Sequence, residues 1–391
     1  MTNGSAPQQS NTDSFGEAVS FVEKHSKLVV LADGSGATIA VWPAMQGRVL
    51  TSSVAGPKGF SFGWINRELI ASGKVAEHMN AVGGEDRIWL GPEGGQFSIF
   101  FAPGVPFDLE HWFTPAPLDT EAFEIVSQSK TSISFRRDFA LTNFSGTKFE
   151  VRIDREVRLL TSDKVWSGLG IDAVDGVKFV AYESENKLTN LAATALKKES
   201  GLLCLCVLSQ LQSTPRTTVV LPFQAGPESE LGIKVTTDYF GVVPEDRISI
   251  GKDSVFFKAD SNWRSKLGLS PKRAKNILGS YDALNGVLTI AQYNKPSKPE
   301  LYVNSAWKIQ EDPFSGDVVN TYNDGPAAPG QGQMGQFYEL ESSSPARELQ
   351  SGETIDHTHR TIHFAGTEEQ LDVISQRTLG VSIKDIRKFN P

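Results

Sequence analysis

The sequence predicts an all-β protein built from large antiparallel sheets with few short helices. Glycine (35 residues) and proline (20 residues) are plentiful and divide the chain into short segments separated by turns. Many of these segments alternate apolar and polar residues, which is the two-residue period of a strand with one buried face. The chain also has 23 phenylalanines, enough to fill a large core. These observations favour stacked antiparallel sheets.

The first residues of the chain are polar and differ in composition from the rest of the sequence. Residues 1–13 contain few apolar side chains, and we expect a disordered tail there. They lack the apolar core of a signal peptide. Two interpretations stay open: a native tail of a cytoplasmic protein, or a spacer left after cleavage of an export signal, which would place the protein in the periplasm.

A helix and a series of strands are predicted after this tail. Residues 14–27 are the best helix candidate, because Phe15, Val19 and Val22 recur near helical spacing. The strand patterns are residues 131–141, 150–160, 201–211, 217–223, 287–293 and 300–307, and a hairpin over 247–259 with its turn at Gly251–Asp253. No linker or change of composition interrupts them, so residues 14–391 are interpreted as a single domain.

Residues 150–160 show the clearest alternation. Four apolar side chains face one side of this strand and four charged side chains face the other. They are Val151, Ile153, Val157 and Leu159 on one side, and Arg152, Asp154, Glu156 and Arg158 on the other. Alternating charges of this kind indicate a solvent-exposed face. Residues 201–211 and 217–223 are continuous apolar runs, which predicts strands covered on both faces.

Charge and cysteine usage restrict the partners of the protein. The net charge of −8 argues against nucleic acid, whose binding depends on clustered lysine and arginine. No apolar run approaches the roughly 20 residues of a membrane span. Cys204 and Cys206 are two residues apart on a predicted strand, so they share a face and are interpreted as a buried pair of free thiols.

Residues 337–341 carry the strongest candidate for acid–base chemistry. Glu339 and Glu341 share one face of a predicted strand, together with Phe337, and no basic residue lies among them. Two neighbouring carboxylates repel, which raises the pKa of one of them and suits it to general acid or base catalysis. The alternative is a pair of solvated surface glutamates.

Three histidines, His357, His359 and His363, share one face of the next predicted strand. A His-x-His pair on a strand can bind zinc, copper or iron, and it can also exchange protons and hydrogen bonds with a sugar. An edge strand with a polar face is the third interpretation. The chain has no phosphate loop, no nucleophile elbow and no Cys-x2-Cys pair, so no cofactor is expected.

Two further segments carry candidate binding residues. Residues 313–333 are interpreted as a long Gly- and Pro-rich loop, whose Asn and Asp side chains suit sugar hydroxyls or form turns. Residues 78–95 combine a tryptophan with charged and amide side chains, a common arrangement for binding carbohydrate. The alternative is that Trp89 lies in the core and Arg87 pairs with Glu85 or Glu93. The candidates are Asp317, Asn320, Asn323 and Asp324 in the first segment, and His78, Asn80, Glu85, Asp86, Arg87, Trp89 and Glu93 in the second.

Residues 337–364, FYELESSSPARELQSGETIDHTHRTIHF, resemble the galactose mutarotase-like (aldose 1-epimerase-like) superfamily. The likeness is a Leu-Glu strand, a loop with proline, a Gly-Glu-Thr turn and a strand with histidines. Residues 284–307 are similar to the strand pair that precedes it, and residues 78–95 resemble a Gly-Gly…Trp…Pro-Glu segment of uncharacterised bacterial relatives. The resemblance covers residues 20–365.

The resemblance implies a β-supersandwich whose concave face binds a mono- or oligosaccharide. It implies that a glutamate of the Leu-Glu strand is the base, which is Glu341 here, with Glu339 one register step away. The superfamily's acid is a mid-chain histidine, but the matching residues 182–192 contain none. His78 or one of the histidines of residues 357–363 (His357, His359 or His363) could replace it. The function implied is an epimerase-like enzyme, with a non-catalytic sugar-binding protein or a hydrolase or lyase, metal-dependent through its histidines, as alternatives.

Overall fold

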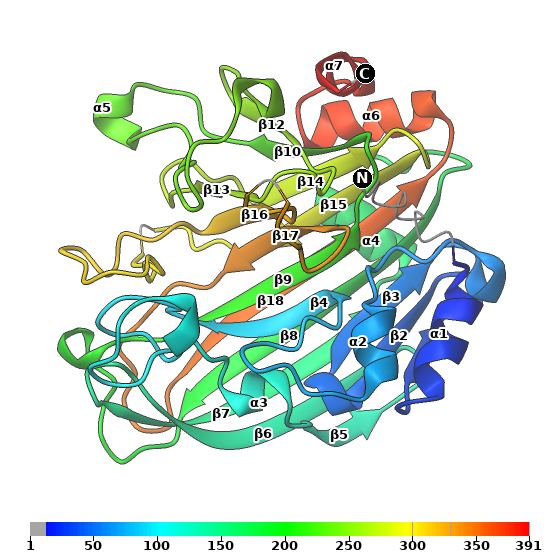
Figure 1. The fold of residues 1–391 in the computed structure, drawn as a ribbon. Helices are drawn as coiled ribbons and strands as arrows, with labels where there is room; N and C mark the ends of the chain where they lie inside the picture. The colour runs from blue at the N-terminus through cyan, green and yellow to red at the C-terminus, as the bar shows by residue number, and fades with distance from the viewer. Residues whose placement is uncertain (1–12, 299, 329, 391) are drawn as a thin grey trace, which may run out of the picture.

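Two antiparallel sheets pack face to face in the computed structural model, which describes residues 13–298, 300–328 and 330–390 (Figure 1). The eight-stranded sheet contains, in spatial order, β1 (Val29–Ala32), β2 (Thr38–Trp42), β3 (Arg48–Ser53), β4 (Gly84–Gly91), β9 (Cys204–Gln212), β17 (Phe337–Ser343), β16 (Val319–Asn323) and β13 (Ser265–Leu269). The predicted all-β class with large antiparallel sheets is confirmed. The predicted tail falls almost entirely on residues 1–12, outside the described residues, and the single-domain boundary stays a prediction.

The second sheet has ten strands. In spatial order they are β11 (Ile248–Ile250), β12 (Ser254–Lys258), β10 (Thr217–Pro222), β14 (Ile277–Asp282), β15 (Val287–Tyr293), β18 (Thr354–Ala365), β8 (Lys178–Asn190), β7 (Lys148–Leu159), β6 (Ser132–Thr142) and β5 (Glu124–Gln128). Apolar side chains from the inner faces of both sheets fill the space between them, among them Val49, Ile88, Ile153 and Leu205. The face of each sheet that points away from this space is called its outer face below.

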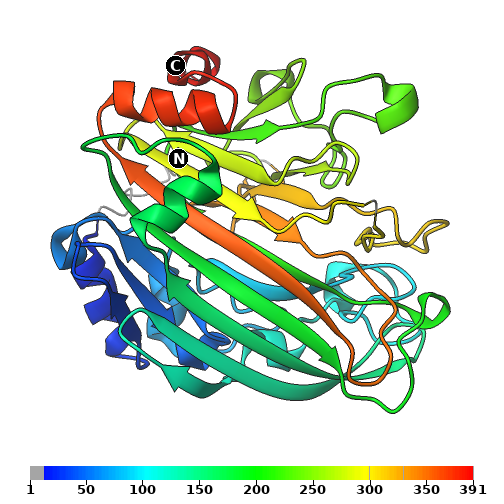
Figure 2. The ribbon, with the colours of Figure 1, turned by 180° about the vertical axis from the view of Figure 1, so that it is seen from behind.

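The described residues also form short helices. They are α1 (Phe15–Glu23), α2 (Arg67–Ser72), α3 (Ala116–Asp119), α4 (Ser162–Leu169), α5 (Glu228–Leu231), α6 (Glu368–Thr378) and α7 (Ile383–Phe389). The helix predicted over residues 14–27 is confirmed as α1, which begins with a capping box between Ser14 and Glu17. Helices α4 and α6 lie on the outer face of the ten-stranded sheet (Figure 2).

Most strand predictions are confirmed. β11 and β12 form the predicted hairpin, and β6 pairs with β7 along its whole length. The predicted exposed face of β7 carries cross-strand ion pairs, such as Arg152 with Asp138. The sulfur atoms of Cys204 and Cys206 lie 3.2 Å apart on the same face, and both are free thiols.

Two assignments were wrong. Residues 300–307 make only an isolated bridge, from Tyr302 to Ser315, among the described residues. The side chain of Asn304 accepts from the backbone N–H of Ala306, so a local turn competes with strand pairing there. The segment 313–333, predicted as a loop, instead contributes β16 with Asn320 and Asn323, because this strand finds partners on both sides. Among the described residues, no helix is long and apolar enough to cross a membrane.

Gly47 is required where β3 approaches the ten-stranded sheet. Its φ is +65°, and a Cβ added there would lie 2.5 Å from the buried ring of Phe135. We therefore expect Gly47→Ala to lower the free energy of unfolding by about 1–3 kcal/mol through overpacking, beyond its backbone strain. Gly104→Ala is the matched control, since Gly104 also has a positive φ but no neighbour within 4 Å. Equal effects in urea denaturation of the two variants would contradict this prediction.

Candidate functional site

A bulge in β4 separates two sets of polar side chains. The pairing of β4 with β9 shifts between Gly84 and Arg87, so the two residues between them, Glu85 and Asp86, both turn toward the space between the sheets. Glu85 accepts hydrogen bonds from Ser52 of its own sheet and from Tyr182 of the other sheet. Arg87 follows on the outer face. The charged residues of β4 therefore point to opposite sides of one strand, with Glu85 and Asp86 on the inner side and Arg87 on the outer face.

Asp86 belongs to a buried polar layer between the sheets. Its carboxylate accepts from Arg155 Nη2 at 2.5 Å and from Ser184 Oγ at 2.8 Å. Arg155 also donates to the Asn186 side chain and to the Gly47 carbonyl. All of these side chains are fully buried, so this ion pair is desolvated and held by hydrogen bonds on both sides.

The three histidines of β18 lie in the same layer. They share one face, as predicted, but β18 is an interior strand of its sheet and not an edge strand. The Ser342 hydroxyl lies 2.8 Å from both His357 Nε2 and His359 Nδ1, and His363 contacts Glu85. Burial lowers the pKa of His357 to about 3 and that of His359 to about 4. In the part of the chain that the structure describes, no cluster of three or more His, Cys, Asp or Glu side chains is arranged to hold a metal ion.

A row of buried polar side chains crosses the outer face of the eight-stranded sheet. It starts with Arg48 on β3 and Arg87 on β4 and continues through Gln210 on β9 to Glu339 and Glu341 on β17. The strand register places Gln210 opposite Glu339 and Leu208 between Arg87 and Glu341. This row is called the outer polar row below. Figure 1 shows that β3, β4, β9 and β17 run side by side.

The two glutamates of β17 form a carboxylate pair with an unusual protonation balance. Burial, followed by the charge of Glu341, raises the pKa of Glu339 to about 8. Burial also raises the pKa of Glu341, but Lys266 opposes this with an ion pair of 2.9 Å. Gln210 Nε2 donates to Glu339, whereas Glu341 Oε1 has no partner although it is buried. Near neutral pH the pair therefore holds one proton on Glu339 and a negative charge on Glu341.

Arg87 and Trp89 extend this arrangement along β4. The guanidinium of Arg87 lies over the Trp89 ring, 4.0 Å from its centroid, and Trp89 Nε1 donates to Glu93 at 2.8 Å. Arg87 Nη2 lies 3.4 Å from a carboxylate oxygen of Asp119, which also accepts three hydrogen bonds from Asn80. Four of the residues predicted in the segment 78–95 therefore meet at one end of the outer polar row: Asn80, Arg87, Trp89 and Glu93.

Three predicted residues of the segment 313–333 lie on β16 or directly after it. Asn320 is paired in register with Glu341 and donates to the Tyr239 hydroxyl. Asn323 is fully buried and holds the backbone at Ser261. Asp324 accepts from the hydroxyl of Tyr322, which is opposite Glu339 in the register.

The structure does not bring the predicted histidines together with the glutamates. His78 donates to the Trp112 carbonyl and contacts the ring of Phe113. His357 and His359 lie on the inner side of the sheets, whereas Glu339 and Glu341 lie on the outer face of β17. Ser342 contacts both histidines. Because Ser342 and Glu341 are consecutive residues of β17, their side chains point to opposite faces, so both histidines lie on the face opposite Glu341.

Four residues of this region were missed in the sequence. Arg48, Asp119 and Gln210 are buried, and Lys266 is mostly buried. A signal was available for Arg48 and Lys266, since each is a lone cation in a strand-like run, "RVLTSS" and "SKLGL". For Asp119 and Gln210 only the pairing of distant strands and loops reveals the role.

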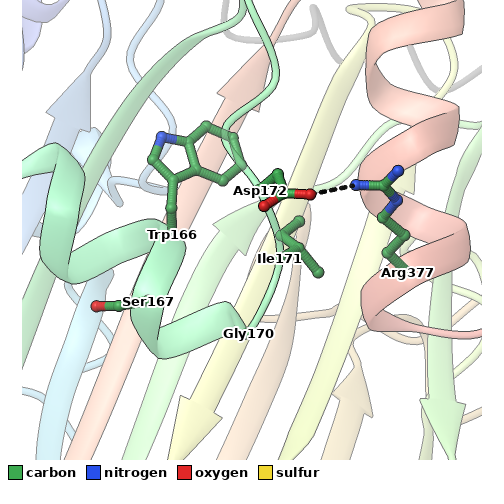
Figure 3. A pocket seen from close by; sticks show the side chains of 6 residues that line it. All are labelled: Trp166, Ser167, Gly170, Ile171, Asp172 and Arg377. Carbon is green, nitrogen blue, oxygen red and sulfur yellow. Dashed lines mark ion pairs between the residues drawn. The ribbon is translucent and has the colours of Figure 1, made fainter.

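A shallow surface depression of about 530 Å³ lies elsewhere, between α4 and α6 (Figure 3). It is lined by Trp166, Ser167, Gly170, Ile171, Asp172 and Arg377. Asp172 and Arg377 are 3.9 Å apart, and the Asp172 side chain is 99% exposed. A weak, solvated ion pair of this kind offers little binding energy. The depression has none of the buried, unpartnered groups of the outer polar row, so the row is the stronger candidate site.

The fold of this chain is similar to that of solved galactose mutarotase-like and aldose 1-epimerase-like structures. The solved structures with this fold include a protein from Escherichia coli K12 described as a proposed aldose 1-epimerase, with a TM-score of 0.52 and 14% identity over 86% of this chain and 98% of that chain. They also include a galactose mutarotase-like protein from Lactobacillus casei ATCC 334, with a TM-score of 0.50 and 10% identity over 86% of this chain and 100% of that chain. At these identities the likeness shows the fold alone.

Within this fold the chain belongs to a particular family, DUF6786, described as a family of unknown function. The family profile matches residues 13–390. No curated protein matches the chain. The predicted resemblance to galactose mutarotase-like proteins is therefore confirmed at the level of fold.

Proposed function

We propose that this protein binds a sugar at the outer polar row and interconverts its anomers, with Glu339 and Glu341 exchanging protons with the sugar. The observation that carries the proposal is the carboxylate pair itself. One member is protonated near neutral pH, and the other is ionised with a buried, unpartnered oxygen, Glu341 Oε1. This is the pairing of acid and base that ring opening of a sugar needs.

The proposed reaction is balanced between the two carboxyl groups. Glu341 removes the proton of the anomeric hydroxyl, and the electron pair of that O–H bond forms the aldehyde. The bond between C1 and the ring oxygen breaks, and Glu339 gives its proton to that oxygen. Ring closure on the other face of the aldehyde reverses both transfers. Glu339 takes the acid role that the sequence prediction gave to a histidine, because the buried His357 and His359 lie inside the sandwich.

The surrounding residues support this mechanism. Lys266 holds Glu341 in its ionised form through the 2.9 Å ion pair. Arg87, which lies over the Trp89 ring, places a cation at one end of the outer polar row.

Exchange spectroscopy by NMR tests this function directly. Wild type is expected to accelerate anomer exchange in at least one sugar of a panel of aldoses, and Glu341→Gln to reduce the rate about 10²- to 10⁴-fold. Glu23→Gln, on the exposed face of α1, is the matched control and is expected to keep the wild-type rate.

Two outcomes would contradict the proposal. Saturable binding of a sugar without faster exchange would reduce the protein to a sugar-binding protein, the alternative that the sequence left open. If no aldose bound or exchanged faster, the carbohydrate function itself would fail.

A further inference from the structure

Four arginine side chains are fully buried, and they differ in how well their N–H groups are paired. They are Arg48, Arg87, Arg155 and Arg273. Arg155 donates to the Asp86 carboxylate, the Asn186 side chain and two backbone carbonyls. Arg273 donates to four backbone carbonyls through all three of its nitrogens. Arg48 donates only to the carbonyl of Gly83, and its Nε and Nη2 have no partner. The Nε of Arg87 also has none.

The two unpaired nitrogens of Arg48 form one edge of its guanidinium. Elsewhere in this protein the same edge binds a carboxylate. Arg152 donates from Nε and Nη2 to the two oxygens of Asp138, each at 2.7 Å, and Arg360 uses the same two nitrogens on Glu183. A planar fork of this kind matches a carboxylate with two parallel hydrogen bonds. In Arg48 the same two nitrogens have no carboxylate partner.

The charges at this end of the outer polar row are also unbalanced. Arg48 and Arg87 lie close enough for the charge of Arg87 to lower the pKa of Arg48, after the larger effect of burial. Asp119 is the carboxylate that contacts Arg87, at 3.4 Å, and it is already engaged by Asn80. The two buried guanidinium groups thus have one carboxylate at ion-pair distance, Asp119, while Glu339 and, for Arg87, Glu93 act on them from farther away. A buried charge without a directly bonded partner is costly.

We propose that Arg48 and Arg87 bind the carboxylate of an acidic sugar, so that the substrate class is a uronate and not a neutral aldose. This inference rests on the proposed function, since it places the carboxylate at the β3–β4 end of the outer polar row and the anomeric carbon at β17. Gln210, whose Oε1 is also buried and unpartnered, lies between the two ends and is available to a sugar hydroxyl.

A matched set of ligands tests the proposal on the wild-type protein. D-Galacturonate, its methyl ester, D-galactose and D-galactose 6-phosphate differ only in the group at C6. We expect calorimetry to give galacturonate about 10- to 150-fold higher affinity than its methyl ester, the range of a charge-assisted hydrogen bond. Arg48→Met is expected to bring this ratio close to one. Arg48→Lys, which keeps the charge and loses the fork, is expected to give an intermediate ratio.

The outcomes separate this proposal from the function on which it rests. If galactose and galacturonate bound equally well and both exchanged anomers faster, the carboxylate site would be wrong and the epimerase function would stand. Preference for the 6-phosphate over galacturonate would replace the carboxylate with a phosphate and overturn the proposed substrate class. If no ligand of the set bound while another aldose of the panel exchanged its anomers faster, the carboxylate site would be wrong and the epimerase function would stand. The wild-type ratios decide these cases even if an Arg48 variant does not fold.

Discussion

Replacing Asp86 by alanine is expected to lower the free energy of unfolding by about 3–5 kcal/mol, because it leaves the guanidinium of Arg155 buried without its anion. Both side chains are fully buried, and their closest N–O distance is 2.5 Å. The remaining partners of Arg155 are uncharged, the Asn186 amide and two carbonyls. The loss is large because water cannot reach the cation in the space between the sheets.

Urea denaturation of wild type, Asp86→Ala, Arg155→Met and the double variant measures this effect. The double variant is expected to be more stable than the sum of the two single changes predicts, since it removes both charges together. Asp138→Ala is the control, because its ion pair with Arg152 is largely exposed and contributes at most about 1 kcal/mol. A loss for Asp86→Ala no larger than that of the control would show that the buried pair does not stabilise the fold.

The polar layer between the sheets shows where prediction from the sequence ends. The alternation in residues 150–160 correctly separated the two faces of β7, and the charged face is exposed where Arg152 pairs with Asp138. The same pattern places Arg155 on the apolar face, and nothing in its own segment explains that. Its partner Asp86 lies 69 residues away, in a strand whose bulge reverses the expected side. Alternation gives the relative side of each residue, and a bulge changes it.

In the strand with Glu339 and Glu341, the sequence predicted the local arrangement but not its position in the fold. Its two-residue spacing correctly placed both carboxylates on one face, and the sequence correctly predicted a raised pKa. The spacing could not tell whether that face looks inward or outward, because both faces of an interior strand are covered in this fold. For the same reason, the sequence placed the three histidines of β18 on one face of their strand but could not show whether that face points into the sandwich.

The proton on Glu339 also predicts an unusual dependence of stability on pH. Burial raises the pKa of Glu339 from its ordinary 4.5 to about 8 in the folded protein. Between these two values the unfolded chain has lost this proton and the folded protein keeps it. The contribution of Glu339 to the free energy of unfolding therefore falls as the pH rises from about 4.5 to about 8, and its cost is fully present above that range.

Denaturation curves at several pH values test this contribution without any substrate. Glu339→Gln removes the titration, so the difference in stability between the variant and wild type is expected to increase in favour of the variant from pH 5 to pH 8.5. Glu23→Gln, an exposed glutamate on α1, is expected to show no such trend. A difference that stayed constant with pH would mean that Glu339 is ionised in the folded protein at neutral pH.

The same proton connects stability to the proposed reaction. If Glu339 is the acid, wild-type turnover falls above about pH 8 as its proton is lost, and it falls at low pH as Glu341, whose pKa is also raised, becomes protonated. Glu339→Gln is expected to lose about 10²- to 10⁴-fold in rate and to lose the alkaline limb of the profile. A variant that was slower but kept that limb would assign the acid to another group. Since burial produces the raised pKa, the cost in stability and the supply of the proton have one physical cause.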